Sequence, residues 1–223
     1  MENTASQPDQ NPSIEWFFDF ISPFAYLQLQ TLKEKQQSHD LHIVYRPILF
    51  AGLLKHWSHL GPAEIPRKRI MTYQYCHWYA HKHNIPYQTP PAHPFNPLQS
   101  LRLAIASGAD PKVVDTLFNG IWGRGLDINH PIVWQSIIDA NHWQEANGQI
   151  GEQWVKDQLR ANTEAAIALG AFGVPSLVIN NKLFWGHDMT DMALDYLANP
   201  GLFDNEEYQR LETLPIAQAR KPV

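Results

Sequence analysis

The residues with the clearest chemical potential lie where an apolar segment gives way to a helical pattern. Ser22 and Pro23 follow the apolar run 14–20 and open the segment 22–37. A serine followed by proline fits the start of a helix, where the hydroxyl can cap free backbone amides and proline loses no hydrogen bond. Because the helix dipole is positive at this end, it favours an anion. The turn therefore predicts a site for a thiolate, carboxylate or phosphate, although a simple helix cap would use the same residues.

A second feature lies far downstream, at the start of another strand. Pro175 precedes the β-branched run 176–179, and a turn at Asn180 and Asn181 leads into residues 182–185. Proline is tolerated at the first position of a strand, and a cis peptide there would expose the amide and carbonyl of Val174.

The chemistry at Ser22 can be narrowed by asking what its hydroxyl could do. A thiol with a pKa near 8.5 is mostly protonated at neutral pH, and a helix N-terminus with a hydroxyl donor stabilises its anion. The other possibility is a nucleophilic serine, but Asp19 and His187 form no recognisable triad motif with Ser22. We favour the thiolate-stabilising role, with the structural cap as its main alternative.

The chain contains a single cysteine, Cys76, within a helical pattern remote from both turns. One thiol cannot form an intramolecular disulfide, so dithiol exchange is excluded. A lone cysteine is usually a small buried apolar residue. Any thiol chemistry must then use a thiol supplied by a cofactor.

Eleven histidines raise the question of a metal. His56 and His59 are three residues apart, and His77 and His81 are four apart, but the glutamate of the His-Glu-x-x-His motif is missing. We expect no metal. Several residues are better candidates for a pocket that binds an aromatic carboxylate: Lys55, His56, Trp57, Phe95, Asn96 and Trp185. The alternative for these residues is ordinary core packing, above all for Phe95 and Trp185.

Strand and helix patterns flank a helical middle. Apolar and alternating runs predict strands at 14–20 and 41–46 and a hairpin at 176–179 and 182–185. Helical patterns separated by proline and glycine are predicted at 22–37, 67–83, 98–107, 111–122, 131–146, 151–169 and 189–198. This order predicts an α/β domain with a helical insertion.

Composition narrows the class of protein. The 223 residues are 44% hydrophobic and 17% charged, with a net charge of -5, so a sizeable core is expected and a basic surface for nucleic acid or an anionic membrane is not. No apolar run approaches the roughly 20 residues of a membrane span. Residues 1–12 are polar, and we expect a disordered tail without a signal-peptide core in a cytoplasmic protein.

These features together resemble the thioredoxin superfamily, with Cys-x-x-Cys replaced by the segment 22–25. The closer similarity is to kappa-class glutathione transferases and bacterial 2-hydroxychromene-2-carboxylate isomerases, and it covers most of the chain. It rests on segments 18–27, 46–47, 52–57, 61–68, 94–98, 172–175 and 184–188. The isomerase branch is favoured by His56-Trp57 and by segments 61–66 and 94–97.

The resemblance implies a thioredoxin-like domain formed by residues 13–66 and 166–223 and interrupted by an all-helical insertion domain at 67–165, as in DsbA. It also implies a homodimer. For the site, it implies glutathione as cofactor, with the γ-glutamyl and carboxylate ends held by matching charged residues. The positions that match the glutathione site are Ser22, His59, Lys68, Val174, Pro175, His187 and Asp188. The chain departs from the family at His59, where asparagine is usual, and at His187-Asp188-Met189, where kappa enzymes have Ser-Asp-Arg.

The activity implied is glutathione-dependent isomerisation of a small aromatic carboxylate. In that family the thiolate is thought to add to a conjugated carbon, which allows rotation about the resulting single bond before elimination. Two alternatives remain: kappa-like transferase or peroxidase activity with the same thiolate, and a noncatalytic thioredoxin-fold module that binds a ligand or partner.

Overall fold

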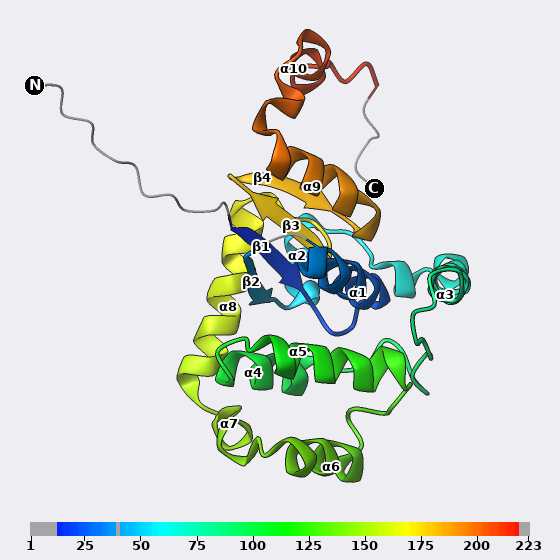
Figure 1. Cartoon of the computed structure of the whole chain (residues 1–223), viewed down its shortest axis with the longest axis vertical. Coiled ribbons are helices and arrows are strands. Elements are labelled where there is room, and N and C mark those ends of the chain that lie inside the picture. The colour runs from blue at the N-terminus through cyan, green and yellow to red at the C-terminus, as the bar shows by residue number, and fades with distance from the viewer. Residues whose placement is uncertain (1–12, 39–40, 219–223) are drawn as a thin grey trace, which may run out of the picture.

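A computed structural model describes residues 13–38 and 41–218, so the tail predicted at 1–12 lies outside the described residues. The chain forms a four-stranded sheet in the order β2-β1-β3-β4 (Figure 1). The strands are β1 (Ile14–Phe18), β2 (Ile43–Pro47), β3 (Ser176–Ile179) and β4 (Lys182–Trp185). β1 runs parallel to β2 and antiparallel to β3, and β3 pairs antiparallel with β4.

The central strand β1 is covered on both faces, which explains its nearly continuous apolar sequence. Side chains alternate in direction along a strand. Trp16 and Phe18 therefore share one face, where their rings stack 4.4 Å apart in the larger core with helix α1 (Pro23–Ser38) and helix α9 (Thr190–Ala198). Phe17 faces the other way and packs with helix α2 (Phe50–Trp57) and helix α8 (Gln153–Ala168).

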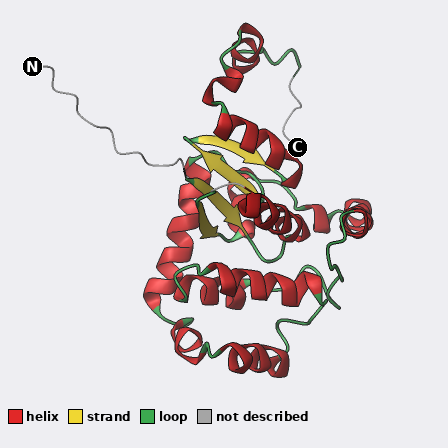
Figure 2. Cartoon of the chain, in the orientation of Figure 1, coloured by secondary structure: helices red, strands yellow, loops and turns green. Residues whose placement is uncertain are grey.

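The middle of the chain is helical, and Figure 2 shows the strands gathered in one place with helices around them. Between α2 and α8 lie α3 (Pro66–Lys82), α4 (Leu98–Ala106), α5 (Pro111–Phe118), a π-helical turn (Asn119–Gly123), α6 (Pro131–Asn141) and α7 (Gln144–Gln149). Helix α8 contacts both α4 and β2, so it connects this helical part to the sheet. The predicted α/β fold with a helical insertion is confirmed.

Two predicted helices differ from the structure, and two observed helices were not predicted. The helix predicted at 131–146 is two helices, because His142 adopts a left-handed backbone conformation with φ of 58° and ends α6. The helix predicted at 111–122 ends at Phe118 and continues as the π turn. Helix α2 and the C-terminal helix α10 (Glu206–Glu212) were not predicted.

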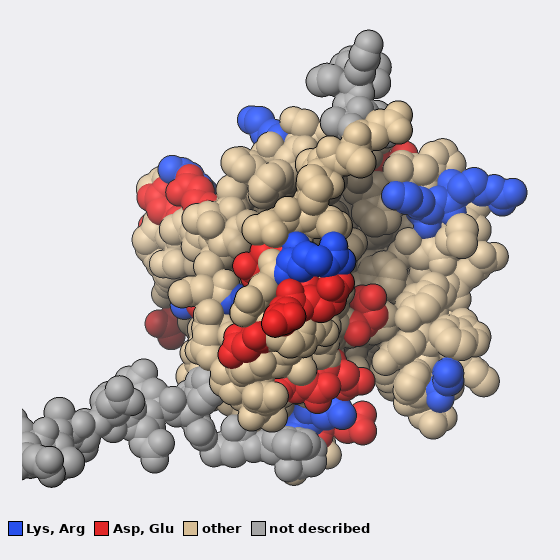
Figure 3. All heavy atoms as spheres, turned by 90° about the horizontal axis from the view of Figure 1, so that it is seen from above, with Lys and Arg blue, Asp and Glu red and all other residues tan. Residues whose placement is uncertain are grey.

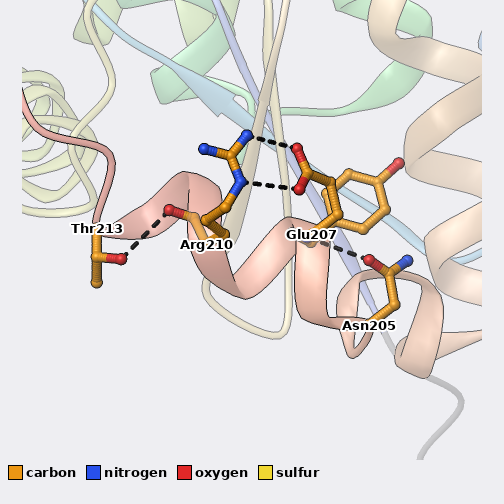
Figure 4. Close-up of polar contacts among 5 residues, drawn as sticks. Asn205, Glu207, Arg210 and Thr213 are labelled. Carbon is orange, nitrogen blue, oxygen red and sulfur yellow. Dashed lines mark hydrogen bonds and ion pairs between the residues drawn. The ribbon is translucent and has the colours of Figure 1, made fainter.

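Helix α10 is short and lies at the edge of the molecule (Figure 1). The Asn205 side chain accepts a hydrogen bond from the Tyr208 N–H, and Arg210 makes a two-point ion pair with Glu207 (Figure 4). The Thr213 hydroxyl donates to the Arg210 carbonyl at the other end. Local contacts of this kind hold a helix with no buried residue of its own.

Candidate active site

The two turns singled out in the sequence meet although 152 residues separate them. The Ser22 hydroxyl oxygen accepts a hydrogen bond from the Ala25 N–H at 3.2 Å, so Ser22 caps α1 as predicted. The same hydroxyl donates to the Val174 carbonyl at 3.4 Å. The Val174–Pro175 peptide is cis. The sheet order, which places β1 beside β3, brings the turns at these strand ends together.

A cavity of about 650 Å³ opens beside Ser22. It is enclosed by the β1–α1 turn, the start of α2, the 3-10 turn η1 (Pro62–Glu64), the first turns of α3, the loop before α4 and the segment 172–174. Figure 3 shows a hollow in the surface beside a group of lysine and arginine atoms. Six of the predicted site residues line the cavity: Ser22, His59, Lys68, Phe95, Val174 and Trp185.

The remaining predicted residues lie elsewhere. Lys55, His56 and Trp57 are exposed at the end of α2, and the Trp57 indole donates to the Ala171 carbonyl at 2.8 Å. The exposed Asn96 accepts a hydrogen bond from the Leu98 N–H at the start of α4. These four side chains therefore lie at the end of α2 or just before α4, and none of them lines the cavity.

Pro175 is buried, follows Val174 in the chain and immediately precedes β3. His187 and Asp188 belong to a 3-10 turn, η3 (His187–Met189), that follows β4. The His187 ring is buried between Phe24, which stacks at 5.6 Å, and Tyr79, whose ring is 4.7 Å away. Burial lowers the pKa of His187. His187 therefore joins η3 to α1 and α3, while the next residue, Asp188, is exposed.

Asp19 is a residue of the cavity that the sequence reading missed as part of the site. It is fully buried, and its two carboxyl oxygens accept hydrogen bonds from the Ile21 N–H at 3.1 Å and the Phe50 N–H at 2.9 Å. Burial raises its pKa to about 7, although these bonds favour the charged form. Asp19 thus joins the Ser22 turn to the start of α2. A carboxylate inside an apolar run was the available signal, because charged residues are rarely buried without partners.

Tyr73 and His93 also line the cavity and were not predicted. The Tyr73 hydroxyl lies 2.7 Å from His93 Nδ1, and His93 Nε2 lies 2.8 Å from the carbonyl oxygen of Ile21. Burial lowers the pKa of His93, and the charge of Arg69 lowers it further. Burial raises the pKa of Tyr73. No motif links these two residues, because they lie 20 positions apart, one in a helix and one in a proline-rich loop.

One wall of the cavity depends on close approach between aromatic and glycine residues. The rings of Phe172 and Trp185 lie 4.7 Å apart, and a side chain at Gly173 would overlap the Trp185 indole. Gly173 therefore allows Trp185 to cover the segment that carries Val174. This arrangement gives the cavity an apolar wall next to a backbone edge.

The cavity suits an anionic thiol ligand that has a peptide backbone. Lys68 and Arg69 provide positive charge at one side, and the α1 N-terminus does so beside Ser22. Within the described residues, no group accepts a hydrogen bond from the Val174 N–H. A free amide beside an engaged carbonyl can pair with an extended backbone. Glutathione, with its peptide backbone, carboxylates and thiol, fits these groups.

Other chemistries find less support in the described part of the chain. Cys76 is fully buried, and burial raises the pKa of its thiol to about 12. No three histidine, cysteine or acidic side chains come together as a metal site among residues 13–38 and 41–218. Nor does any helix described there have the length and apolar character needed to cross a membrane.

The fold and the paired turns define the class of protein, and sequence comparison agrees. The profile of the DSBA-like thioredoxin domain matches residues 13–198, and the chain belongs to this family.

Within that family, distant homology links the chain to two kinds of enzyme. It is 26% identical over 186 residues to the 2-hydroxychromene-2-carboxylate isomerase of Pseudomonas putida, covering 78% of this chain and 89% of that protein. It is 28% identical over 207 residues to glutathione S-transferase kappa 1 of Homo sapiens, covering 83% and 90%. The resemblance predicted from the sequence is confirmed.

Solved structures show the same fold. A 2-hydroxychromene-2-carboxylate isomerase structure superposes with a TM-score of 0.76 at 22% identity, covering 90% of this chain and 97% of that one. The cytosolic disulfide reductase DsbM from Pseudomonas aeruginosa with GSH superposes with a TM-score of 0.56 at 13% identity, covering 90% and 98%.

Proposed function

We propose that this protein is a glutathione-dependent isomerase that acts on 2-hydroxychromene-2-carboxylate or a similar small aromatic carboxylate. The observation that carries the proposal is the meeting of the Ser22 hydroxyl, the α1 N-terminus and Val174 in one cavity. Glutathione, when bound, supplies a thiol that can add to a conjugated carbon and leave again. The distant isomerase relatives support this choice of reaction.

Ser22 has the central role in this proposal. Its hydroxyl already donates to a carbonyl oxygen at the cavity surface. The same O–H can turn toward a sulfur anion without the burial of any further polar group. The Ala25 N–H keeps the oxygen in place by donating to it. A charge-assisted hydrogen bond and the helix N-terminus both favour a thiolate over a thiol. The protein would thus lower the pKa of the bound thiol.

The glutathione contacts follow from position and charge. Val174 offers its N–H to the cysteinyl backbone, with Pro175 fixing that segment behind it, and Lys68 offers its ammonium to a carboxylate. Asp188, exposed on η3, would take the γ-glutamyl ammonium. His59 lines the cavity, whereas His187 would act by fixing η3 against α1 and α3.

The substrate would occupy the apolar part of the cavity. Phe95 and Trp185 provide flat apolar surfaces for an aromatic ring, and Arg69 lies in the lining as a partner for a carboxylate. Four exposed residues outside the cavity lining remain proposed substrate contacts, which a substrate would meet as it enters the cavity: Lys55, His56, Trp57 and Asn96.

A kappa-like transferase or peroxidase is the second candidate, supported by the similarity to the human kappa enzyme. The test is to supply glutathione with 2-hydroxychromene-2-carboxylate, with an aryl halide, and with an organic hydroperoxide. We expect turnover of the first at a much higher kcat/KM than of the others. A preference for the aryl halide or hydroperoxide would favour the kappa-like activity, and binding without turnover would favour the noncatalytic module.

We also propose a cytoplasmic homodimer that binds neither nucleic acid nor membrane. Exposed apolar side chains along α3 support self-association, including Met71 and Trp78 at 66% and 55% exposure. The net charge of -5 supports the absence of nucleic-acid binding. Light scattering coupled to size-exclusion chromatography should give twice the mass of one chain.

A further inference from the structure

The proposed reaction needs proton transfer, and the cavity wall contains a pair of side chains suited to it. A cyclic 2-hydroxychromene-2-carboxylate must lose the proton of its 2-hydroxyl group, and its ring oxygen must gain one, before the opened chain can rotate. The Ser22 hydroxyl is already hydrogen-bonded to the first turn of α1 and to the Val174 carbonyl. Both carboxyl oxygens of Asp19 accept hydrogen bonds from backbone N–H groups. These groups are poorly placed to serve as the base.

The hydrogen-bond roles of Tyr73 and His93 follow from their neighbours. The Ile21 carbonyl can only accept, so His93 Nε2, at 2.8 Å, must carry a proton. In the neutral ring Nδ1 is then an acceptor, and the Tyr73 hydroxyl at 2.7 Å donates to it. The lone pairs of the Tyr73 oxygen are left for a donor in the cavity, which Tyr73 lines. The order is substrate hydroxyl, Tyr73, His93, Ile21 carbonyl.

We propose that Tyr73 and His93 form a proton relay in which Tyr73 takes the proton of a substrate hydroxyl and passes its own to His93 Nδ1. This inference rests on the proposed isomerase function. The substrate O–H electron pair forms the carbonyl as the ring C–O bond breaks, and that bond's electron pair stays on the ring oxygen. The imidazolium then returns its proton through Tyr73 to the ring oxygen. No proton is gained or lost overall.

The surroundings of His93 favour the neutral ring that the relay requires. The titratable or charged groups facing it are Tyr73 and Arg69, both on α3. On its other sides lie the Ile21 carbonyl and the aromatic rings of Phe95 and Trp122. Burial and the charge of Arg69 lower the pKa of His93 from its ordinary value of 6.5, which favours the neutral ring. Protonation at lower pH would remove the acceptor at Nδ1.

The test compares Tyr73→Phe and His93→Gln with matched changes outside the cavity. Glutamine keeps a donor for the Ile21 carbonyl but offers no basic nitrogen. Tyr45→Phe removes a hydroxyl from β2, and His77→Gln changes an exposed histidine on α3. With 2-hydroxychromene-2-carboxylate as substrate, Tyr73→Phe should lower kcat by about 100-fold or more, with glutathione affinity and thermal midpoint unchanged. Both control variants should behave as the wild type.

The pH profile and nitrogen NMR separate a relay from a merely structural contact. Because burial lowers the pKa of His93, wild-type kcat/KM should fall only at a pH below the ordinary histidine value, and His93→Gln should lack this acid limb. Long-range proton–nitrogen spectra should show His93 neutral with its proton on Nε2 at pH 7.

Three results would overturn the relay: turnover by Tyr73→Phe equal to that of Tyr45→Phe, an unchanged acid limb in His93→Gln, or a proton on Nδ1 of His93 at pH 7. Wild-type protein that does not convert the substrate would overturn the proposed function, and the relay with it. Wild-type turnover with an undiminished Tyr73→Phe rate would overturn the relay alone.

Discussion

The cavity has two regions that are built in different ways. The floor, formed by Asp19, Ser22 and Val174, is buried and held by hydrogen bonds to backbone groups. The rim, represented by Lys68 and His59, consists of exposed side chains on α3 and on the segment after α2. The difference suggests that the floor determines the chemistry of a bound thiol, whereas the rim determines how firmly the ligand is held.

Among changes to the floor and the rim, loss of the Ser22 hydroxyl should have the largest effect on turnover. Ser22→Ala removes a charge-assisted hydrogen bond of about 1.5–3 kcal/mol from the thiolate, so kcat should fall by roughly one to two powers of ten. Ser107→Ala is the matched control, because that hydroxyl also sits at a helix end but lies outside the cavity. Equal turnover in a folded Ser22→Ala protein would remove the distinction between floor and rim.

Asp19 should make the stability of the floor depend on pH. Its pKa in the folded protein, about 7, lies above the ordinary 3.8, so between these values the folded state holds a proton that the unfolded chain releases. The free energy of unfolding should therefore fall as pH rises from about 4 to 7, by at most about 4 kcal/mol at 1.4 kcal/mol per unit.

Urea unfolding of the wild type and Asp19→Asn across this pH range measures the contribution of Asp19. The variant should lack the decrease, while the rest of the pH dependence stays. An identical slope in both proteins would show that Asp19 does not titrate in this window.

Changes at the rim should affect glutathione binding more than turnover. Lys68→Met should raise the dissociation constant about tenfold, the equivalent of 1.4 kcal/mol, and saturating glutathione should restore much of the rate. Lys112→Met, an exposed lysine at the start of α5, is the control. Calorimetric titration gives the affinities, and a Lys68→Met protein that binds normally but turns over slowly would contradict the assignment.

Asp188 extends the same test beyond the cavity lining. Asp188→Asn should weaken glutathione binding if this exposed carboxylate takes the γ-glutamyl ammonium. The effect should be at most that of Lys68→Met, because an exposed ion pair contributes about 0.2–1 kcal/mol. An unchanged affinity would leave the ammonium to another partner.

The smallest effect is expected at Cys76. Cys76→Ser should keep most glutathione-dependent turnover, because the thiol is buried and its pKa is raised to about 12. Neither protein should reduce insulin disulfides, which needs a second thiol. Loss of turnover in a folded Cys76→Ser protein would implicate the protein thiol instead of the cofactor.

Sequence reasoning located Ser22 and Val174 better than the residues at the end of α2, and the reason is geometric. Ser22 and Val174 lie at turns beside paired strands, so the sheet fixes where their backbone atoms meet. Lys55, His56 and Trp57 lie at the end of α2, a helix that was not predicted, and the direction of a helical side chain depends on how the helix packs. Their place outside the cavity lining could not be obtained from sequence spacing.

The groups that were missed depend on tertiary contacts. Asp19 was noticed only as a possible triad member, because its partners, the Ile21 and Phe50 amides, come from separate segments. The contact between Tyr73 and His93 needs α3 and the loop before α4 to lie together. Propensities and motifs describe neighbours along the chain, so contacts across it stay hidden until the fold is known.

The most direct test of the central claim is the pKa of the glutathione thiol bound to this protein. Thiolate absorbance in the ultraviolet, followed through a pH titration of the complex, measures it. The account predicts a pKa clearly below the ordinary thiol value of about 8.5 in the wild type, and a rise toward that value in Ser22→Ala. Bound glutathione whose thiol ionises at its ordinary pKa in the wild type, or equally in both proteins, would contradict the claim that Ser22 and the α1 N-terminus stabilise a thiolate.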